Sequence, residues 1–304
     1  MSVENKATSA FCASCDTTAT DDIRLMKCDG CDLVKYCSDE CQRNHKPEHE
    51  EVCKERVADL RDELLFKQPE GSHMGDCPIC SLPLPLEMDE STINNCCSKT
   101  ICNGCAFANK GREIRGGLVQ SCPFCREPLP LTMEGAIEQR MKRVEANDPN
   151  AIRQEGGKHD KKGDYSKAFE YFAKAAELGD AEAHYKLSFL YREGKGVEED
   201  WEKEIHHLEE AAIGGHPKAR YNLGCHELNN NYSAERAVKH WIIAARQGDD
   251  KSIKQLMKMF KGELMGKEDL TATLRAHQNA LNEMKSPQRN KAEDYRLWES
   301  RWLK

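Results

Sequence analysis

The chain has 304 residues, enough for two or three domains, and 38% of them are hydrophobic, so its cores are of modest size. The formal net charge is -7, which disfavours general electrostatic attraction to nucleic acid. No apolar run reaches the roughly eighteen residues of a membrane span, and the segment MSVENKATSA lacks the basic and apolar regions of a signal peptide. We therefore expect a cytoplasmic or nuclear protein without membrane contact.

Cysteine is the most informative residue type in this sequence. Of sixteen cysteines, fifteen lie between residues 12 and 125, mostly in pairs separated by two residues. Disulfides are rare in a reducing compartment, and such pairs are typical of metal ligation. We therefore expect bound zinc. Only Cys225 stands apart, and we expect it to be a small buried hydrophobe.

After a tail at 1–10 that is expected to be disordered, four ligand pairs follow one another. Four pairs are enough for two closed tetrahedral zinc sites, but their spacing alone leaves open which pairs share an ion. The pairs are Cys12 and Cys15, Cys28 and Cys31, Cys37 and Cys41, and His49 and Cys53.

The motifs CASC, CDGC, YCSDECQ and HEEVC resemble the MYND zinc finger, here expected over residues 11–54. His45 lies where that family often has a histidine that binds no metal, so His49 is the preferred ligand. Lys46 and Glu50 replace a common tryptophan and a common lysine, which puts the usual small core and binding face in doubt. The resemblance implies interleaved sites, with Cys12, Cys15, Cys37 and Cys41 on one zinc and Cys28, Cys31, His49 and Cys53 on another.

MYND fingers are chiefly modules that receive short proline-containing peptides. Some are embedded in lysine methyltransferases, but those enzymes need a large catalytic domain whose motifs this sequence lacks. We therefore expect protein or peptide partners for this finger. A helical linker is expected to follow it over residues 55–75.

The second cysteine cluster, expected to be a domain at 76–131, begins with CPICSLPLPL and ends with CPFCREPLPL. Its eight cysteines resemble an all-cysteine RING finger. In that family first and third pairs share one ion, and second and fourth pairs share the other. Lys99 occupies the usual histidine position and is a poor zinc ligand, so the adjacent Cys96, the least secure ligand, would complete the set. The resemblance implies one site from Cys77, Cys80, Cys102 and Cys105 and another from Cys96, Cys97, Cys122 and Cys125, giving four zinc ions per chain.

Active RING fingers recruit a ubiquitin-conjugating enzyme through apolar residues in two knuckles and a cation after the last cysteine. Those positions hold Ile79, Pro123 and Arg126. Such a ligase orients the thioester and has no catalytic nucleophile of its own. Many active members have a tryptophan where this chain has Asn109, and a purely structural role for these residues remains the alternative.

Residues 132–147 are expected to form a charged connecting helix, after which the sequence changes character. Three segments, at 165–180, 201–216 and 234–249, each end in Ala-Ala-x-x-Gly and place apolar residues on one helical face. Periods of this length predict stacked helical hairpins, and the pattern resembles Sel-1-like repeats, relatives of the tetratricopeptide class, over 148–285. The last part of that region reads as a degenerate capping unit. A tail at 286–304 is a possible docking helix with exposed Trp298 and Trp302.

The sequence thus predicts a mostly α-helical protein with MYND-like and RING-like zinc modules followed by an α-solenoid. Two functions compete. One is an adaptor that selects clients through its repeats and acts as a ubiquitin ligase or ligase subunit. The alternative is a non-catalytic scaffold whose zinc fingers serve folding and peptide binding. Whether the protein is an enzyme stays open, as do the client and the conjugating partner.

Overall fold

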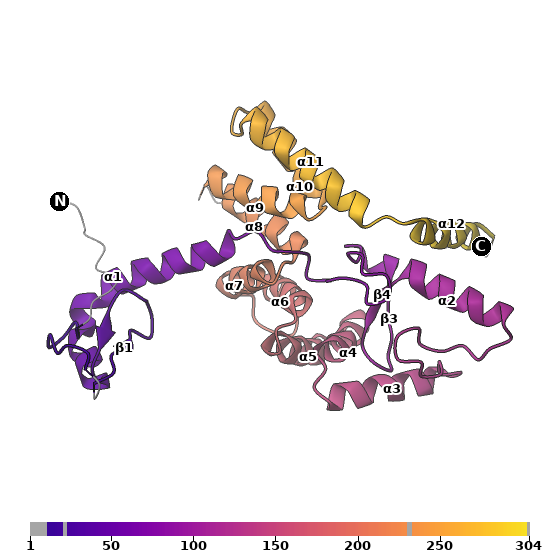
Figure 1. The fold of residues 1–304 in the computed structure, drawn as a ribbon, viewed down its shortest axis with the longest axis horizontal. Coiled ribbons are helices and arrows are strands. Elements are labelled where there is room, and N and C mark those ends of the chain that lie inside the picture. The colour runs from indigo at the N-terminus through magenta and orange to yellow at the C-terminus, as the bar shows by residue number, and fades with distance from the viewer. Residues whose placement is uncertain (1–10, 21–22, 230–232, 303–304) are drawn as a thin grey trace. The chain divides into compact units, whose positions relative to one another are not determined.

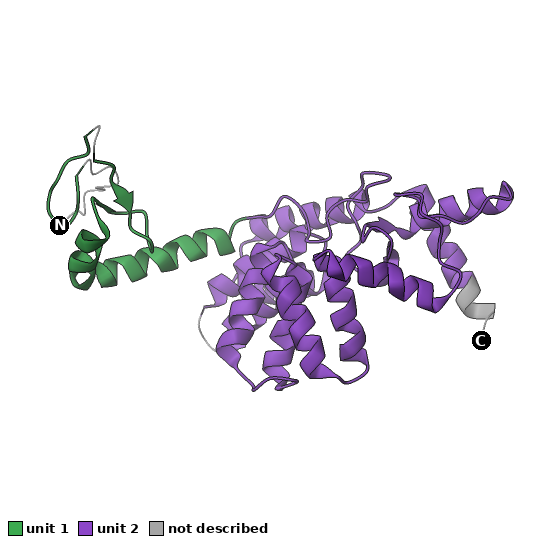
Figure 2. Ribbon diagram, turned by 90° about the horizontal axis from the view of Figure 1, so that it is seen from below, with its two compact units in different colours: residues 1–67 green, residues 68–304 purple. Residues whose placement is uncertain are grey.

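The computed structural model describes residues 11–20, 23–229 and 233–302, and the expected disorder of residues 1–10 lies outside them (Figure 1). This part of the chain contains twelve α-helices and two small two-stranded sheets. It divides into two compact units, residues 1–67 and 68–304 (Figure 2). None of the described helices is long and apolar enough to cross a bilayer.

The first unit consists of a short antiparallel hairpin, β1 (Met26–Lys27) and β2 (Lys35–Tyr36), and the helix α1 (Asp39–Leu65). The Ser38 hydroxyl caps α1 by accepting a hydrogen bond from the Cys41 backbone N–H. The expected helical linker at 55–75 is only partly correct. Its first half continues α1, but the rest of the segment, residues 66–75, is not helical. Residues 68–75 belong to the second unit.

The second unit begins with the region of the second cysteine cluster, here called the cysteine module (residues 76–131). Its buried core combines Leu84 and Ile101 with three of the cysteines, Cys77, Cys102 and Cys105. Among the described residues of this module, Leu84 and Ile101 are the only large hydrophobic side chains that are buried, so the cysteines themselves fill much of its centre. Its elements are a 3-10 turn (Met88–Glu90), the antiparallel strands β3 (Ser91–Ile93) and β4 (Thr100–Cys102), and the helix α2 (Asn103–Arg115).

The helix α3 (Met133–Glu145) follows, as expected for the connecting segment, and leads into a series of helical hairpins. The apolar faces predicted for the repeated segments contain Phe172, Leu208 and Trp241 at equivalent positions, and all three are buried to an exposure of 1% or less. Gly224 permits the closest of these packings, because a Cβ there would lie 2.5 Å from Trp241 Nε1. The helices are α4 (Pro149–Lys161), α5 (Tyr165–Glu177), α6 (Ala181–Glu193), α7 (Trp201–Ile213), α8 (Pro217–Asn229), α9 (Ala234–Arg246), α10 (Asp250–Lys261) and α11 (Lys267–Glu283).

The repeated Ala-Ala-x-x-Gly segments end one helix and start the next. Each glycine at this corner has a positive φ, which is 83° at Gly215, so the chain can turn left-handed there. The residue after it caps the following helix: Asp180 caps α6, and Asp249 caps α10. At the equivalent corner before α8 the capping residue is His216, whose Nδ1 accepts from the Ala219 N–H at 3.2 Å.

The C-terminal tail forms a helix, α12 (Pro287–Trp302), that packs against α2 (Figure 1). The Phe107 and Tyr295 rings lie 5.2 Å apart, and Ala292 is 6% exposed at the contact. Trp298 is exposed, whereas the side chain of Trp302 lies outside the described part of the chain.

Candidate metal centres

Three of the Cys-x2-Cys turns share one backbone conformation. The residue after the second cysteine has a positive φ in each case, 56° at Asp16, 55° at Ser81 and 67° at Arg126. Its N–H donates to the carbonyl of the first cysteine at 2.8 to 3.0 Å, and an isolated β-bridge closes each turn. The repeated sequences CPIC at 77–80 and CPFC at 122–125 therefore form the same type of knuckle, and the turn that begins at Cys12 forms a third.

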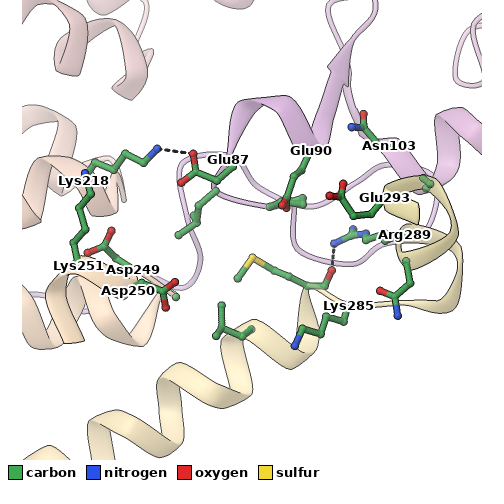
Figure 3. Close-up of a pocket in the computed structure, with 18 of the residues that line it drawn as sticks. Glu87, Glu90, Asn103, Lys218, Asp249, Asp250, Lys251, Lys285, Arg289 and Glu293 are labelled. Atoms are coloured by element: carbon green, nitrogen blue, oxygen red, sulfur yellow. Dashed lines mark hydrogen bonds and ion pairs between the residues drawn. The ribbon is translucent and has the colours of Figure 1, made fainter. Parts of the chain in front are cut away.

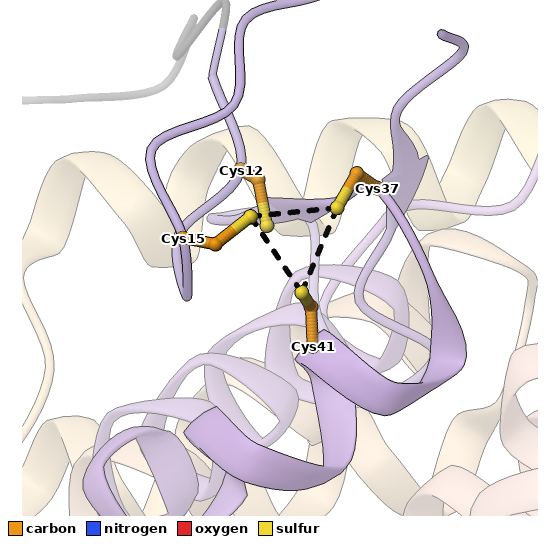
Figure 4. A group of neighbouring side chains, drawn as sticks. All are labelled: Cys12, Cys15, Cys37 and Cys41. Carbon is orange, nitrogen blue, oxygen red and sulfur yellow. Dashed lines mark hydrogen bonds between the residues drawn. The ribbon is translucent and has the colours of Figure 1, made fainter.

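The first group of ligand atoms, here called the Cys12 cluster, contains Cys12, Cys15, Cys37 and Cys41 (Figure 4). The Sγ of Cys15 lies 3.5 Å from that of Cys37 and 3.6 Å from that of Cys41, and the Cys37–Cys41 sulfur distance is 3.6 Å. These separations exclude disulfide bonds, which need about 2.0 Å. A tetrahedral zinc ion with Zn–S bonds of about 2.3 Å separates its sulfurs by about 3.8 Å, so this arrangement fits zinc.

The second group, the Cys28 cluster, contains Cys28, Cys31, His49 and Cys53. The sulfurs of Cys28 and Cys53 are 3.8 Å apart, and Cys31 Sγ lies 3.1 Å from His49 Nε2. His45 lies outside this group, with its Nδ1 3.1 Å from the Tyr36 hydroxyl. The structure therefore places the preferred histidine at the cluster and gives the other a hydrogen bond to Tyr36.

Backbone hydrogen bonds prepare some of these thiols to ionise. Burial opposes ionisation of Cys12, but N–H groups of Cys37, Ser14 and Cys15 outweigh it and lower the pKa of Cys12 to about 6. Burial likewise opposes ionisation of Cys77, and backbone N–H groups, first that of Cys102, lower its pKa to about 7. Zinc binds thiolates, so this chemistry also favours the metal.

The cysteine module holds two further groups. The Cys77 cluster comprises Cys77, Cys80, Cys102 and Cys105, and the Cys96 cluster comprises Cys96, Cys97, Cys122 and Cys125. The Cys80–Cys102 sulfur distance is 3.8 Å, the Cys97–Cys122 distance 3.9 Å and the Cys96–Cys125 distance 3.4 Å. First and third pairs thus share one group and second and fourth pairs the other, which is a cross-braced arrangement.

Adjacent cysteines can both reach one cluster because the chain turns tightly around them. The N–H groups of Cys97 and Ser98 both donate to the Asn94 carbonyl, and Ser98 has a φ of 55°. Asn94 is itself buried and bonds across the turn to the Lys99 carbonyl. Lys99 is exposed, with its ammonium 6.0 Å from the Phe124 ring centroid, and is not a member of the cluster.

The residues expected to contact a conjugating enzyme lie on the surface of the cysteine module. Ile79 is 44% exposed, Arg126 is exposed, and Pro123 is half-buried. Asn109, at the position of the common tryptophan, donates to the Ser121 carbonyl. The carboxylate of Glu113 accepts from the Ser121 N–H and hydroxyl, so α2 is tied to the last knuckle by polar bonds.

The N-terminal finger carries a surface groove of about 930 Å³ beside its second cluster. The exposed side chains of Val57 and Ala58 contribute apolar surface to the groove. Both departures from the MYND pattern, Lys46 and Glu50, lie in its lining. Relative to the common tryptophan and lysine, these two residues change the charge of the groove.

One buried polar group was not recognised from the sequence, and it centres on His216. His216 is 1% exposed, and its Nε2 lies 2.9 Å from Glu182 Oε2. His73 joins them, with its ring stacked on that of His216 at 4.1 Å and its Nε2 3.4 Å from the same oxygen. His216 aligns in the repeats with Asp180 and Asp249, which cap the equivalent helices. This alignment could have identified it as a capping residue from the sequence.

This trio does not fit a metal ion, although its ligand atoms lie close together. The Nδ1 of His216 accepts from a backbone N–H, so its Nε2 carries the proton and donates to Glu182. Burial lowers the pKa of His216 to about 4, which keeps its ring neutral at pH 7.

A cavity of about 730 Å³ lies in the second unit between the cysteine module, the last repeat and α12 (Figure 3). Its lining mixes acidic side chains such as Glu90 with basic ones such as Lys251. Lys218 of α8 crosses it to Glu87 at 3.2 Å, linking the repeats to the cysteine module. Since the lining carries charges of both signs, it selects no single charge class of ligand.

Two family models match the sequence. The MYND finger matches residues 12–53, and the Sel1 repeat matches residues 152–180, 181–216 and 217–249. A Sel1 repeat protein from Oxalobacter formigenes is 24% identical over 50% of this chain and 63% of its own, with a TM-score of 0.40. The protein c5321, a protective antigen of uropathogenic Escherichia coli with an SLR fold, is 20% identical over 54% of this chain and 36% of its own, with a TM-score of 0.38.

The chain thus spans less than two thirds of the length of these two structures. The MYND match covers both N-terminal clusters, and the Sel1 matches begin in α4 and end after α9. The resemblances of the sequence to the MYND finger and to Sel-1-like repeats are confirmed. The chain therefore carries a zinc-binding MYND finger at residues 12–53 and three Sel1 repeats at residues 152–249.

Proposed function

We propose that this protein is a zinc-dependent interaction adaptor whose cysteine module is a RING-type ubiquitin ligase module. The observation that carries the proposal is the crossed pairing of the Cys77 and Cys96 clusters around one small core, with Ile79 and Arg126 exposed on its knuckles. The repeats and the MYND finger supply surfaces for client proteins. The many unpaired thiols suit the cytoplasm or the nucleus, where thiols stay reduced.

The proposed zinc content is four ions per chain, one for each cluster. The sulfur separations of 3.4 to 3.9 Å within the clusters support this count, because a tetrahedral zinc site requires values in this range. Cys96, the least secure ligand by sequence, lies within its cluster. Each ion would have a structural role, since all four ligand positions belong to the protein.

The proposed transfer step needs no nucleophile from this chain. Ile79 and Pro123 would contact the ubiquitin-conjugating enzyme, and the Arg126 guanidinium would hold ubiquitin and its carrier in one reactive orientation. Arg126 keeps a positive φ of 67°, a conformation that costs a side-chain-bearing residue about 1 kcal/mol. Asp16 and Ser81 share this conformation, so it belongs to the knuckle turn, and any substitution at Arg126 must tolerate it.

Ubiquitin discharge from loaded conjugating enzymes tests this proposal. Arg126→Asn is the sharpest variant, because asparagine tolerates a positive φ and the knuckle keeps its shape. Arg115→Asn is the matched control, an exposed arginine at the end of α2. We expect the wild type and the control to stimulate discharge, and Arg126→Asn and Ile79→Ala to lose the stimulation.

The second candidate is a peptide-binding scaffold without transfer activity, and the groove of about 930 Å³ on the MYND finger favours it. Absence of discharge across a broad enzyme panel, from protein shown to hold its zinc, would leave this function in place of the first. Binding of proline-containing peptides, weakened by Val57→Arg at the groove, would then be the expected result. Val52→Arg, on the same helix, exposed and outside the groove lining, is the control.

A further inference from the structure

The first turn of α12 places one arginine against the first knuckle of the cysteine module. The Nη1 of Arg289 donates to the carbonyls of Pro83 at 2.7 Å and Met284 at 2.6 Å. Its Nη2 donates to the Leu82 carbonyl at 3.2 Å and to Cys80 Sγ at 3.6 Å. Three carbonyls thus fix the plane of the guanidinium and direct one N–H at a proposed zinc ligand.

The rest of α12 holds this arginine in place. Gly104, at the start of α2, has no room for a side chain, because a Cβ there would lie 2.8 Å from the Arg289 backbone nitrogen. Further along α12, Tyr295 packs on Phe107, and Arg296 forms an ion pair with Asp89 at 2.8 Å. The glycine and the helix contacts together bring the arginine to the knuckle.

A zinc ion with four thiolates carries a net charge of about -2. A guanidinium that donates to one of those sulfurs forms a charge-assisted hydrogen bond, stronger than a bond to a neutral thiol. The Cys77 cluster is largely buried, so the neighbouring charge is poorly screened by water. Partners of this kind orient metal ligands and strengthen metal binding, typically by 10-fold to 100-fold.

We propose that Arg289 is an outer-sphere partner of the zinc ion at the Cys77 cluster, and that α12 is thereby a working part of the cysteine module. The C-terminal helix retains the metal, and the bound metal in turn holds the helix. This inference rests on the proposed zinc site. Arg289 is then a positioning residue. The C-terminal helix has a role within this protein instead of docking to another protein.

A purely structural role for Arg289 makes a different prediction. In that case the three carbonyls account for the contact, and losing the arginine would loosen α12 without changing the electronic environment of one metal ion. A direct probe of the metal therefore separates the two. The full-length protein substituted with cadmium-113 supplies it, because the cadmium chemical shift responds to hydrogen bonds at its sulfur ligands.

The variants are Arg289→Met and, as the matched control, Arg296→Met, which removes another α12 contact away from the thiolates. We expect one resonance, that of the Cys77 cluster, to move in Arg289→Met and to stay in place in the control. Native mass spectrometry during chelator challenge, with alkylation mapping of the freed cysteines, should show that cluster losing zinc about tenfold faster. Arg289→Lys, which keeps the charge but loses the planar fork, should give an intermediate rate.

Unchanged resonances in Arg289→Met, or equal movement in both methionine variants, would overturn the inference. If Arg289→Met does not fold, Arg289→Lys decides by the same comparison. Failure of the zinc site itself is distinguishable, because the wild type would then bind no metal at Cys77 and its partners. If the wild type gives all of its resonances and Arg289→Met changes none of them, only the role of Arg289 is refuted.

Discussion

The histidine cap of α8 should make the second unit sensitive to mild acid, and His216→Asn tests this. Asparagine is a good capping residue whose Oδ1 can accept from the Ala219 N–H as Nδ1 does in the wild type. It does not titrate, and it is too short to repeat the bond to Glu182. At pH 7 the variant should therefore lose about 2 kcal/mol, the value of a hydrogen bond to a charged group.

The pH dependence follows from the direction of the pKa shift. Burial lowers the pKa of His216 from 6.5 to about 4, so the unfolded chain binds more protons than the folded one between these values. Stability is then highest above pH 6.5 and falls as the pH drops toward 4, by about 3 kcal/mol in total and by about 2 kcal/mol between pH 7 and 5. The groups around this ring are Glu182 and Tyr185 from α6, His73 from the segment before the cysteine module and Lys218 from α8. Lys186 of α6 pairs with Glu182 at 3.3 Å.

Acid also releases zinc, so the comparison must be a difference between proteins. Urea unfolding followed by fluorescence of the buried Trp241 reports on the repeats, and the wild type minus His216→Asn removes contributions common to both. We expect this difference in unfolding free energy to shrink as the pH falls from 7 to 5. A difference that stays constant over that interval would refute the assignment of His216 as a neutral, buried cap.

Two further predictions concern the metal sites and the repeat packing. Anaerobically purified protein should hold close to four zinc ions by elemental analysis. His49→Ala should lower that count, whereas His45→Ala should leave it unchanged. The reverse pattern would show that His45 is the ligand. Gly224→Ala should lower the unfolding free energy by about 1 to 3 kcal/mol, because its Cβ would overlap Trp241, whereas Gly157→Ala, with no atom within 4 Å, should raise stability by up to about 1 kcal/mol in thermal unfolding. Equal effects of the two alanines would contradict the packing argument.

Much of the local structure was predictable from short-range chemistry. Two cysteines separated by two residues in a knuckle can reach the same ion without help from the rest of the chain, so the ligand groups of the MYND finger could be proposed from spacing and resemblance. The repeat packing was equally local, because each repeated helix has one apolar face to bury, on which Phe172, Leu208 and Trp241 occupy equivalent positions. The confirmed MYND and Sel1 matches fall on these segments.

The tertiary structure decided the features that depend on residues far apart in the chain. No local pattern indicates that Arg289 reaches Cys80, 209 positions earlier, or that Gly104 is small to admit it. The same holds for the group around His216. His73 reaches it because residues 68–75 lie along the turn that holds Gly215, and Glu182 reaches it from the neighbouring repeat. Sequence periodicity determines which face of a helix is buried, whereas the partner that covers it is selected by long-range packing.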